Sequence, residues 1–403
     1  MLKNVLKYFS IIIITIISLP IFIDYLGLYE LAIFTNKILN SKNKDSQKIR
    51  SYGDLIFNKK KMNEYYGMQV DPYVVSSSQS IHPYYLFTPK WKKLEKINNK
   101  VLNFEKDGFR FTEYNNAEYE GFILGGSTAF GYFNQSDKTT IASILNKNQN
   151  EFNFKNKALP SWNSHQELLA FIKNYSKKTK ISISLTLGND TTIYLKNKCK
   201  KLNYLNMYPD TPEFFDMLDK VLSEKNNEAS LIDFFPKTLI LIKRLNIVFT
   251  KEKTNFDKYV DLQNLNCPFS DKDVSLLSEA IIRNHEIIRN LIEDNGGRHI
   301  LISQPTYDLH KTAKTGSTYW SENSLKFKES VISEVFKSHF CKKDCLDFTR
   351  IFDEGSGVKN LLDLKDNENI LDAQMVDTLH TTSTGNKIIV EKILPFIKNE
   401  KKN

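Results

Sequence analysis

The run GFILGGSTAFG, residues 121–131, decides how this chain is interpreted. A short apolar stretch that suits a buried strand leads directly into two glycines, a serine and a threonine. Such a turn can simply reverse the chain, cradle a phosphate or hold a nucleophile. A P-loop is excluded because Tyr132 stands where that loop has its lysine, and the G-x-G-x-x-G spacing of dinucleotide sites is missing. Ser127 is well placed as a nucleophile, since small neighbours admit a substrate carbonyl and a helix N-terminus favours negative charge.

Around this turn the sequence alternates apolar strands with amphipathic helices, which is typical of a parallel sheet covered by helices. The pattern predicts strands at 121–125, 181–187, 299–305 and 345–349, and helices at 137–148, 164–177 and 385–398. Between about 200 and 295 it changes to three helical stretches, near 211–224, 230–246 and 271–294. We therefore expect an α/β domain with a helical insertion at 200–295.

Two further motifs supply the partners that a serine nucleophile needs. Asp377 and His380 are three residues apart, a spacing that can place both on one face of a turn. The carboxylate can then fix the imidazole tautomer and leave Nε2 to act as general base. Asn189 follows the strand at 181–187, at the edge where open α/β sheets bind ligands, and its amide can donate to an oxyanion. Each motif alone also fits an ordinary turn or a packed histidine, but their combination favours a site.

In their order along the chain, these motifs resemble those of the SGNH (GDSL-like) hydrolase family. GGST at 125–128 matches the serine block, GND at 188–190 the asparagine block and DTLH at 377–380 the Asp-x-x-His block. NKALPSWNSHQEL at 156–168 looks like the family's Asn-x-Gly-x-x-Gly segment. The resemblance covers residues 118–400 and implies a three-layer α/β/α domain with a mostly parallel sheet.

The resemblance also implies a role for each residue of the site. The catalytic triad is Ser127, His380 and Asp377, and the oxyanion donors are the N–H groups of Ser127 and Ser161 together with the amide of Asn189. The sequence departs from the family at Ala158 and Ser161, where glycines are usual. Ser161 keeps the backbone N–H that the family's glycine donates, but a site that requires positive φ would be unusual for serine.

The function implied is that of a serine esterase that hydrolyses acyl esters without a cofactor or a metal. An acyl ester on a cell-envelope glycan is the expected substrate, by family analogy. An O-acyltransferase acting on an envelope polysaccharide uses the same residues, and a non-catalytic envelope-assembly or glycan-binding protein can keep the same scaffold. The α/β-hydrolase fold is the structural rival, because GGSTA nearly fits its G-x-S-x-G elbow; Ala129 in place of the last glycine counts against it.

The N-terminus predicts a membrane anchor. Lys3 and Lys7 precede an uncharged run at 8–23, which Asp24 ends and no small-x-small cleavage site follows. We expect residues 1–30 to form an uncleaved single-pass transmembrane helix with its N-terminus in the cytoplasm. A cleaved signal peptide is the alternative, because the run is shorter than a full span. Residues 31–115 would be a membrane-proximal extension of short strands and loops, and residues 116–403 the hydrolase domain on the periplasmic or extracellular side.

Composition and charge narrow the function classes. The chain has 403 residues, of which 41% are hydrophobic and 26% charged, as in globular proteins. Its net charge of +9 is spread over Lys-rich segments, which we interpret as solvated faces; a membrane or acidic-polymer surface is the alternative, ahead of nucleic acid. The four cysteines, Cys199, Cys267, Cys341 and Cys345, can form two disulfides in an oxidising compartment, with the last two the nearest pair. His339 beside that pair leaves zinc as an alternative that lacks a fourth ligand.

Overall fold

The structure is a computed structural model that describes residues 65, 79–82, 86–89, 101–199, 267–313, 320–354, 357–361, 364 and 368–398. The expected anchor at 1–30 and the expected helices near 211–224 and 230–246 lie outside the described residues. Within the described ranges, no helix combines the length and the hydropathy of a membrane span. The expected extension contributes one antiparallel pair of short strands, β1 (Gln79–His82) and β2 (Leu86–Pro89).

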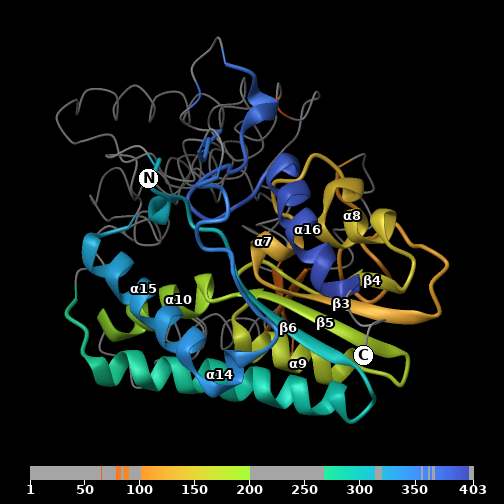
Figure 1. The fold of residues 1–403 in the computed structure, drawn as a ribbon, viewed down its shortest axis with the longest axis horizontal. Helices are drawn as coiled ribbons and strands as arrows, with labels where there is room; N and C mark the ends of the chain where they lie inside the picture. The colour runs from red at the N-terminus through yellow and green to blue at the C-terminus, as the bar shows by residue number, and fades with distance from the viewer. Residues whose placement is uncertain are drawn as a thin grey trace, which may run out of the picture. The chain divides into compact units, whose positions relative to one another are not determined.

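A sheet of five parallel strands forms the centre of the domain (Figure 1). The strands are β3 (Tyr119–Gly125), β4 (Phe152–Asn156), β5 (Thr179–Thr186), β6 (Arg298–Ser303) and β7 (Cys345–Asp347), in the spatial order β4-β3-β5-β6-β7. The middle strands are buried on both faces, as the apolar runs of β3 and β6 predict; β5 alternates apolar residues with serine and threonine, yet these hydroxyl side chains are buried as well. The predicted parallel sheet is confirmed, and β4 is a strand that the sequence analysis did not identify.

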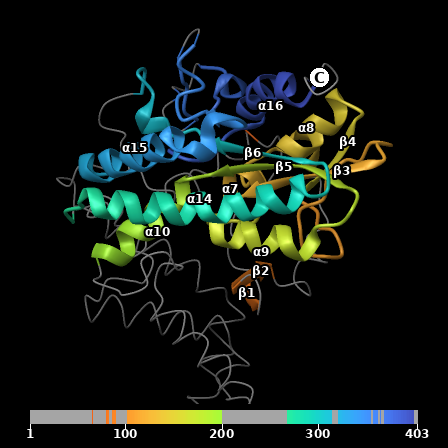
Figure 2. The same cartoon turned by 60° about the horizontal axis from the view of Figure 1, so that its bottom comes forward.

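Helices cover both faces of the sheet and give the three α/β/α layers (Figure 2). On one face α8 (Ile141–Asn148) packs with α16 (Ser383–Lys398). The other face carries α9 (Ser164–Asn174), α10 (Gly188–Cys199), α14 (Asp271–Glu293) and α15 (Glu322–Lys337). The main core lies between the layers, around strand residues such as Ile123, Ile183 and Ile300.

Two helices differ from the sequence-based expectations. α14, the last stretch of the expected insertion, packs against α9, β5 and β6, so it is part of the layer that covers the sheet. α10 begins at Gly188, so Gly188-Asn189-Asp190 is the first turn of a helix that follows β5 almost directly. The polar side chain of Asn189 is therefore held on a regular element.

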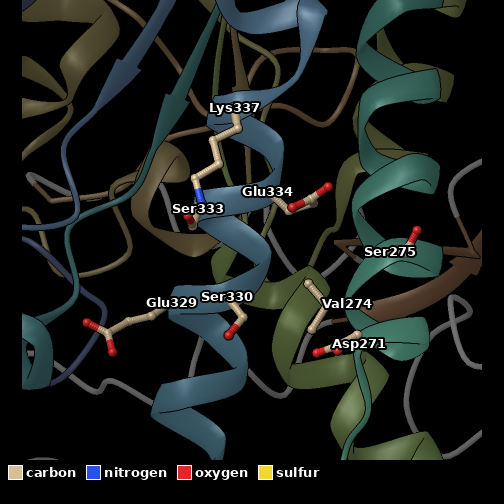
Figure 3. Close-up of a pocket in the computed structure, with 8 residues that line it drawn as sticks. All are labelled: Asp271, Val274, Ser275, Glu329, Ser330, Ser333, Glu334 and Lys337. Atoms are coloured by element: carbon tan, nitrogen blue, oxygen red, sulfur yellow. The ribbon is translucent and has the colours of Figure 1, made fainter.

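A cavity of about 570 Å³ lies between α14 and α15 (Figure 3). Its lining is mostly polar and contains three acidic residues: Asp271, Val274, Ser275, Glu329, Ser330, Ser333, Glu334 and Lys337. These residues include serines but no histidine that could act as a base for them. The predicted site residues Ser127, Asn189 and His380 lie on other elements.

The strand order creates a switch point beside β3. β4 lies on one side of β3 and β5 on the other, so successive connections cross the sheet in opposite directions. Doubly wound sheets of this kind bind ligands at the carboxyl ends of the strands, at the switch point. Ser127 directly follows β3 and Asn189 directly follows β5, so both lie at this edge of the sheet.

Two disulfides join the four cysteines. Cys199–Cys267 has a sequence separation of 68 and fastens the end of α10 to the segment that enters α14. Cys341–Cys345 has a separation of four and closes the turn before β7. Because Cys341 and Cys345 are oxidised, neither supplies the thiolate that zinc would need. The described residues contain no group of three or more His, Cys, Asp or Glu side chains suited to a metal ion.

We expect the long-range disulfide to contribute more stability than the short one. Replacing Cys199 and Cys267 by alanine should lower the free energy of unfolding by about 4 kcal/mol, because a long loop regains its freedom in the unfolded chain. Replacing Cys341 and Cys345 by alanine should cost about 2 kcal/mol. Denaturant unfolding of both double variants without reductant measures the two losses. An equal loss, or a larger one for the short loop, would contradict this expectation.

Candidate active site

Ser127, His380 and Asp377 form a continuous line of hydrogen bonds. His380 Nε2 lies 2.8 Å from Ser127 Oγ, and His380 Nδ1 lies 2.7 Å from Asp377 Oδ2. The first contact joins residues 253 positions apart in the sequence. The fold thus brings the three predicted triad residues together with the contacts that a serine nucleophile, its base and an orienting carboxylate require. Their catalytic roles stay predictions.

The turn from Asp377 to His380 is organised by its own carboxylate. Asp377 Oδ1 accepts hydrogen bonds from the backbone N–H groups of Leu379 and His380, both at 2.8 Å. Burial alone would raise the pKa of Asp377, but His380 and these N–H donors outweigh it and hold the pKa below its ordinary value. Asp377 is therefore ionised at neutral pH, which favours a proton on Nδ1 and leaves Nε2 to accept the proton of Ser127.

The histidine turn is also fastened to the helix that carries the serine. α7 (Ser127–Phe130) follows β3 directly, and Thr128 Oγ1 donates to the carbonyl oxygen of Leu379 at 2.8 Å. The rings of Tyr132 and Phe133 flank the imidazole of His380, with centroids 5.6 and 5.1 Å away. The sequence alone did not identify these supporting residues, although Thr128 lies within the run GFILGGSTAFG at 121–131. Thr128 thus joins the segment that carries the nucleophile directly to the turn that carries the base.

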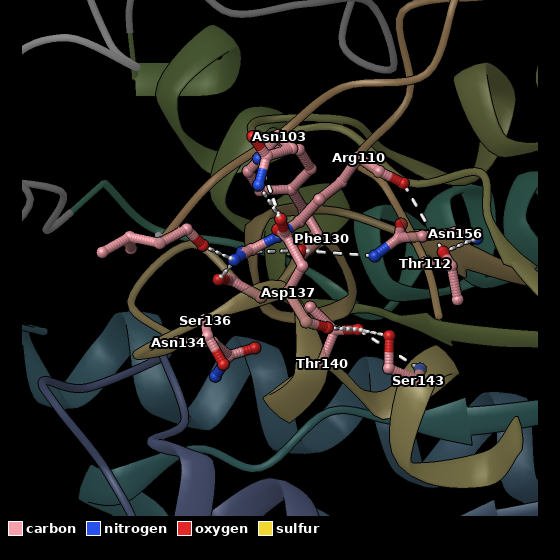
Figure 4. Close-up of polar contacts among 12 residues, drawn as sticks. Asn103, Arg110, Thr112, Phe130, Asn134, Ser136, Asp137, Thr140, Ser143 and Asn156 are labelled. Atoms are coloured by element: carbon pink, nitrogen blue, oxygen red, sulfur yellow. Dashed lines mark hydrogen bonds and ion pairs between the residues drawn. The ribbon is translucent and has the colours of Figure 1, made fainter. Parts of the chain in front are cut away.

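A buried arginine fixes the end of α7 (Figure 4). Arg110 is 1% exposed, donates to the carbonyl oxygens of Phe130 and Gly131, and forms a 2.7 Å ion pair with Asp137. Asn156 Nδ2 donates to the carbonyl oxygen of Phe130 as well, at 3.3 Å. These donors satisfy carbonyl groups that the end of a helix leaves without partners. Arg110 lies in the segment assigned to the membrane-proximal extension, so this part of that segment belongs to the site's support.

The segments that carry the predicted oxyanion donors meet at Gly126. A Cβ atom on Gly126 would lie 2.3 Å from Asn189 Nδ2 and 3.1 Å from the carbonyl oxygen of Trp162, so a larger residue would displace them. Asn189 Nδ2 donates to that carbonyl oxygen at 2.7 Å. Because an amide nitrogen carries two hydrogens, the second remains for an oxyanion. Asn189 is thus held beside Ser127 and beside the segment that contains Ser161.

Ser161 adopts the left-handed backbone conformation. Its φ is 67°, and Leu187, which precedes α10, has a φ of 77°. Left-handed backbone costs a residue with a side chain roughly 1–2 kcal/mol. The chain therefore keeps, with serine, a backbone conformation that glycine adopts more easily, and it does so next to the proposed oxyanion donors. Such strain is concentrated at functional sites in proteins.

Among known proteins, the chain is similar only to solved structures. No protein-family model and no curated protein matches the chain. A presumed acylhydrolase from Bacteroides fragilis NCTC 9343 is 11% identical, with a TM-score of 0.34 over 70% of this chain and 88% of that chain. A GDSL-like lipase from Bacteroides thetaiotaomicron VPI-5482 is 10% identical, with the same TM-score and the same coverage of both chains. A likeness at this level establishes neither a family nor an activity.

The left-handed conformation of Ser161 predicts that glycine is better suited to this position. Ser161→Gly should raise the free energy of unfolding by roughly 0.5–1 kcal/mol, because relief of strain exceeds the added entropy of the unfolded chain. Ser275→Gly within α14 is the matched control and should lower it by roughly 0.5–1 kcal/mol. Denaturant unfolding measures both. Equal destabilisation of the two variants would show that Ser161 is not strained in solution.

Proposed function

We propose that this protein is a serine esterase that hydrolyses acyl esters. The observation that carries the proposal is the line from Ser127 through His380 to Asp377, with contacts of 2.8 and 2.7 Å. A serine hydroxyl bonded to an imidazole, which is bonded in turn to an ionised carboxylate, is the arrangement that activates serine for attack on an acyl carbon. Ser127 and His380 are both partly exposed, so a substrate can reach them.

The proposed reaction runs in two halves. In the first, Ser127 Oγ attacks the ester carbonyl while His380 Nε2 takes the hydroxyl proton, and the tetrahedral intermediate collapses as His380 returns that proton to the leaving alcohol. In the second, His380 takes a proton from water, which attacks the acyl-enzyme. The carboxylic acid leaves, and the proton returns to Ser127 Oγ. Asp377 orients the imidazole throughout and stabilises its charged form.

The oxyanion of each intermediate would be held by donors that are already in place. The backbone N–H groups of Ser127 and Ser161 and the amide of Asn189 are the proposed donors. The hydrogen bond from Asn189 to Trp162 fixes the amide before substrate arrives. A fixed donor avoids reorganisation during the reaction, and loss of one such donor costs roughly 3–4 kcal/mol of transition-state stabilisation in a comparable enzyme.

We further propose that the substrate is an acyl ester of a cell-envelope glycan outside the cytoplasmic membrane. The two disulfides support this location, because disulfides persist in oxidising compartments. The uncharged run at 8–23, expected to be an anchor, supports it as well. The exposure of the serine and histidine at the end of the sheet suits an acyl group carried on a large polymer.

The nucleophile assignment predicts the behaviour of three variants. Ser127→Ala and His380→Ala should each abolish release of acetate from an activated acetyl ester, and the double variant should lose no more, because the two residues act as a unit. A fluorophosphonate should label wild type and Ser275→Ala, the control, but not Ser127→Ala. Wild-type turnover in a folded Ser127→Ala protein would refute the assignment, and a wild-type protein without labelling would favour the non-catalytic alternative.

The oxyanion assignment predicts a loss in kcat for Asn189 variants. Asn189→Ala should lower kcat roughly 10²- to 10³-fold with little change in KM, because the amide bonds most strongly to the charge that develops in the transition state. Asn189→Asp should be at least as damaging, since it places a negative charge beside that anion. Steady-state kinetics measures both, with circular dichroism as the control for folding. Near-normal turnover in folded Asn189→Ala would assign the residue to the helix start alone.

A further inference from the structure

Asp190 connects α10, which carries Asn189, to the start of α9, three positions after Ser161. Its Oδ1 accepts hydrogen bonds from the backbone N–H of Ser164 at 3.0 Å and from Ser164 Oγ at 2.6 Å. Its Oδ2 accepts from Thr186 Oγ1 at 3.1 Å. Asp190 is 5% exposed, so a broken contact would leave a buried charge without compensation. The carboxylate therefore joins the start of α10, the end of β5 and the start of α9.

These contacts run beside the one made by the preceding residue. Asn189 binds the carbonyl oxygen of Trp162, and Asp190 binds Ser164, two positions further along the same segment. Ser164 Oγ also accepts from Asn284 Nδ2 of α14 at 3.1 Å, which ties this segment to a third helix. Two consecutive residues of α10 thus hold the stretch that begins with strained Ser161.

We propose that Asp190 is a positioning residue: it fixes Ser161 and Asn189 relative to each other and so sets the geometry of the oxyanion site. The proposal rests on the esterase function proposed above. Asp190 acts through other residues, because its own carboxylate is occupied by Ser164 and Thr186. Without it, Ser161 can relax from its left-handed conformation and the two donors can separate.

A second carboxyl group, Glu167 of α9, is fully buried, and its charge would interact with that of Asp190. The positioning role of Asp190 should therefore depend on pH. Burial and, to a smaller extent, the charge of Asp190 raise the pKa of Glu167 to about 8, while the hydroxyls of Ser184 and Thr186 act in the opposite direction. Burial raises the pKa of Asp190 as well, but the groups of Ser164 and Thr186 that donate to it act in the opposite direction, so of the two carboxyls Glu167 is the one expected to carry the proton at neutral pH. Above pH 8 both would be charged and would repel each other.

The raised pKa of Glu167 determines in which direction pH affects the stability of the site. The neutral form of Glu167 favours the folded site fully below the ordinary pKa of glutamate, and this advantage is lost as the pH rises through about 8. The other titratable groups near Asp190 are His165 of α9, whose pKa burial lowers, and Arg283 of α14, which lies near His165. His165 is therefore neutral at pH 8.

The kinetic test compares Asp190→Ala with Asp190→Asn. With kcat expressed per site titrated by a fluorophosphonate, Asp190→Ala should lower kcat roughly 10- to 100-fold and leave KM nearly unchanged. Asp190→Asn should recover most of the loss, because its carbonyl oxygen still accepts from Ser164. A merely structural residue would reduce the number of titratable sites but not the kcat of those that remain. Unchanged kcat per site in Asp190→Ala would overturn the proposal.

The pH profile provides a second test in a matched pair of variants. Wild-type kcat should fall as the pH rises above about 8, and Glu167→Gln should remove that fall because glutamine cannot ionise. Glu286→Gln, at an exposed position of α14, is the control and should keep the wild-type profile. A Glu167→Gln profile identical to that of wild type would overturn the link between the two carboxyls.

Amide hydrogen exchange separates this proposal from the proposed function. In Asp190→Ala, the amides of residues 161–166 should exchange roughly tenfold faster or more, while those of β5 and β6 keep their protection. This measurement needs no activity. A wild-type protein that is neither labelled nor active would overturn the esterase function alone, whereas unchanged exchange at 161–166 would overturn the role of Asp190.

Discussion

The hydrogen bond between His380 Nε2 and Ser127 Oγ forms only if the turn from Asp377 to His380 and the helix that follows β3 keep one relative position. Such a contact cannot be held by the two side chains alone, because a partly exposed hydrogen bond contributes only about 1 kcal/mol. The structure holds it from both sides. Asp377 binds the backbone of its own turn, Thr128 joins that turn to α7, and Arg110 fastens the other end of α7.

Burial and hydrogen-bond donors act in opposite directions on the pKa of the buried carboxyl groups of this domain. Asp377 and Asp190 each accept several hydrogen bonds. Glu167 retains its proton because burial dominates. On the same face of the sheet, burial lowers the pKa of His285 to about 3, so this residue pairs with His299 as a neutral ring. This distribution limits the cost of burying charge within a site that requires polar groups.

The sequence supported the strands, the layer architecture and the three motifs, because each is a local pattern. Apolar runs identified β3, β5 and β6, but β4 is a five-residue edge strand whose alternation is too short to separate from loop. α15 was missed because Lys328 interrupts its apolar face, yet the structure buries that lysine. Arg110 and Asp190 could not be assigned, since their roles depend on partners far away in the sequence. Contacts of that kind leave no periodic signal.

The Cys199–Cys267 disulfide fixes the distance between the end of α10 and the segment before α14, whatever the number of residues between the two cysteines. Its Cα atoms are 5.3 Å apart, a span that two residues of extended chain can cover. The covalent path from α10 to α14 therefore passes through the sulfur atoms, however many residues lie between the two cysteines. That stretch can therefore change in length while Asn189 and Asp190 keep their places, ten and nine positions before Cys199. Because its length can change, the stretch between the two cysteines is where related proteins would be expected to acquire different specificities while the catalytic residues stay the same.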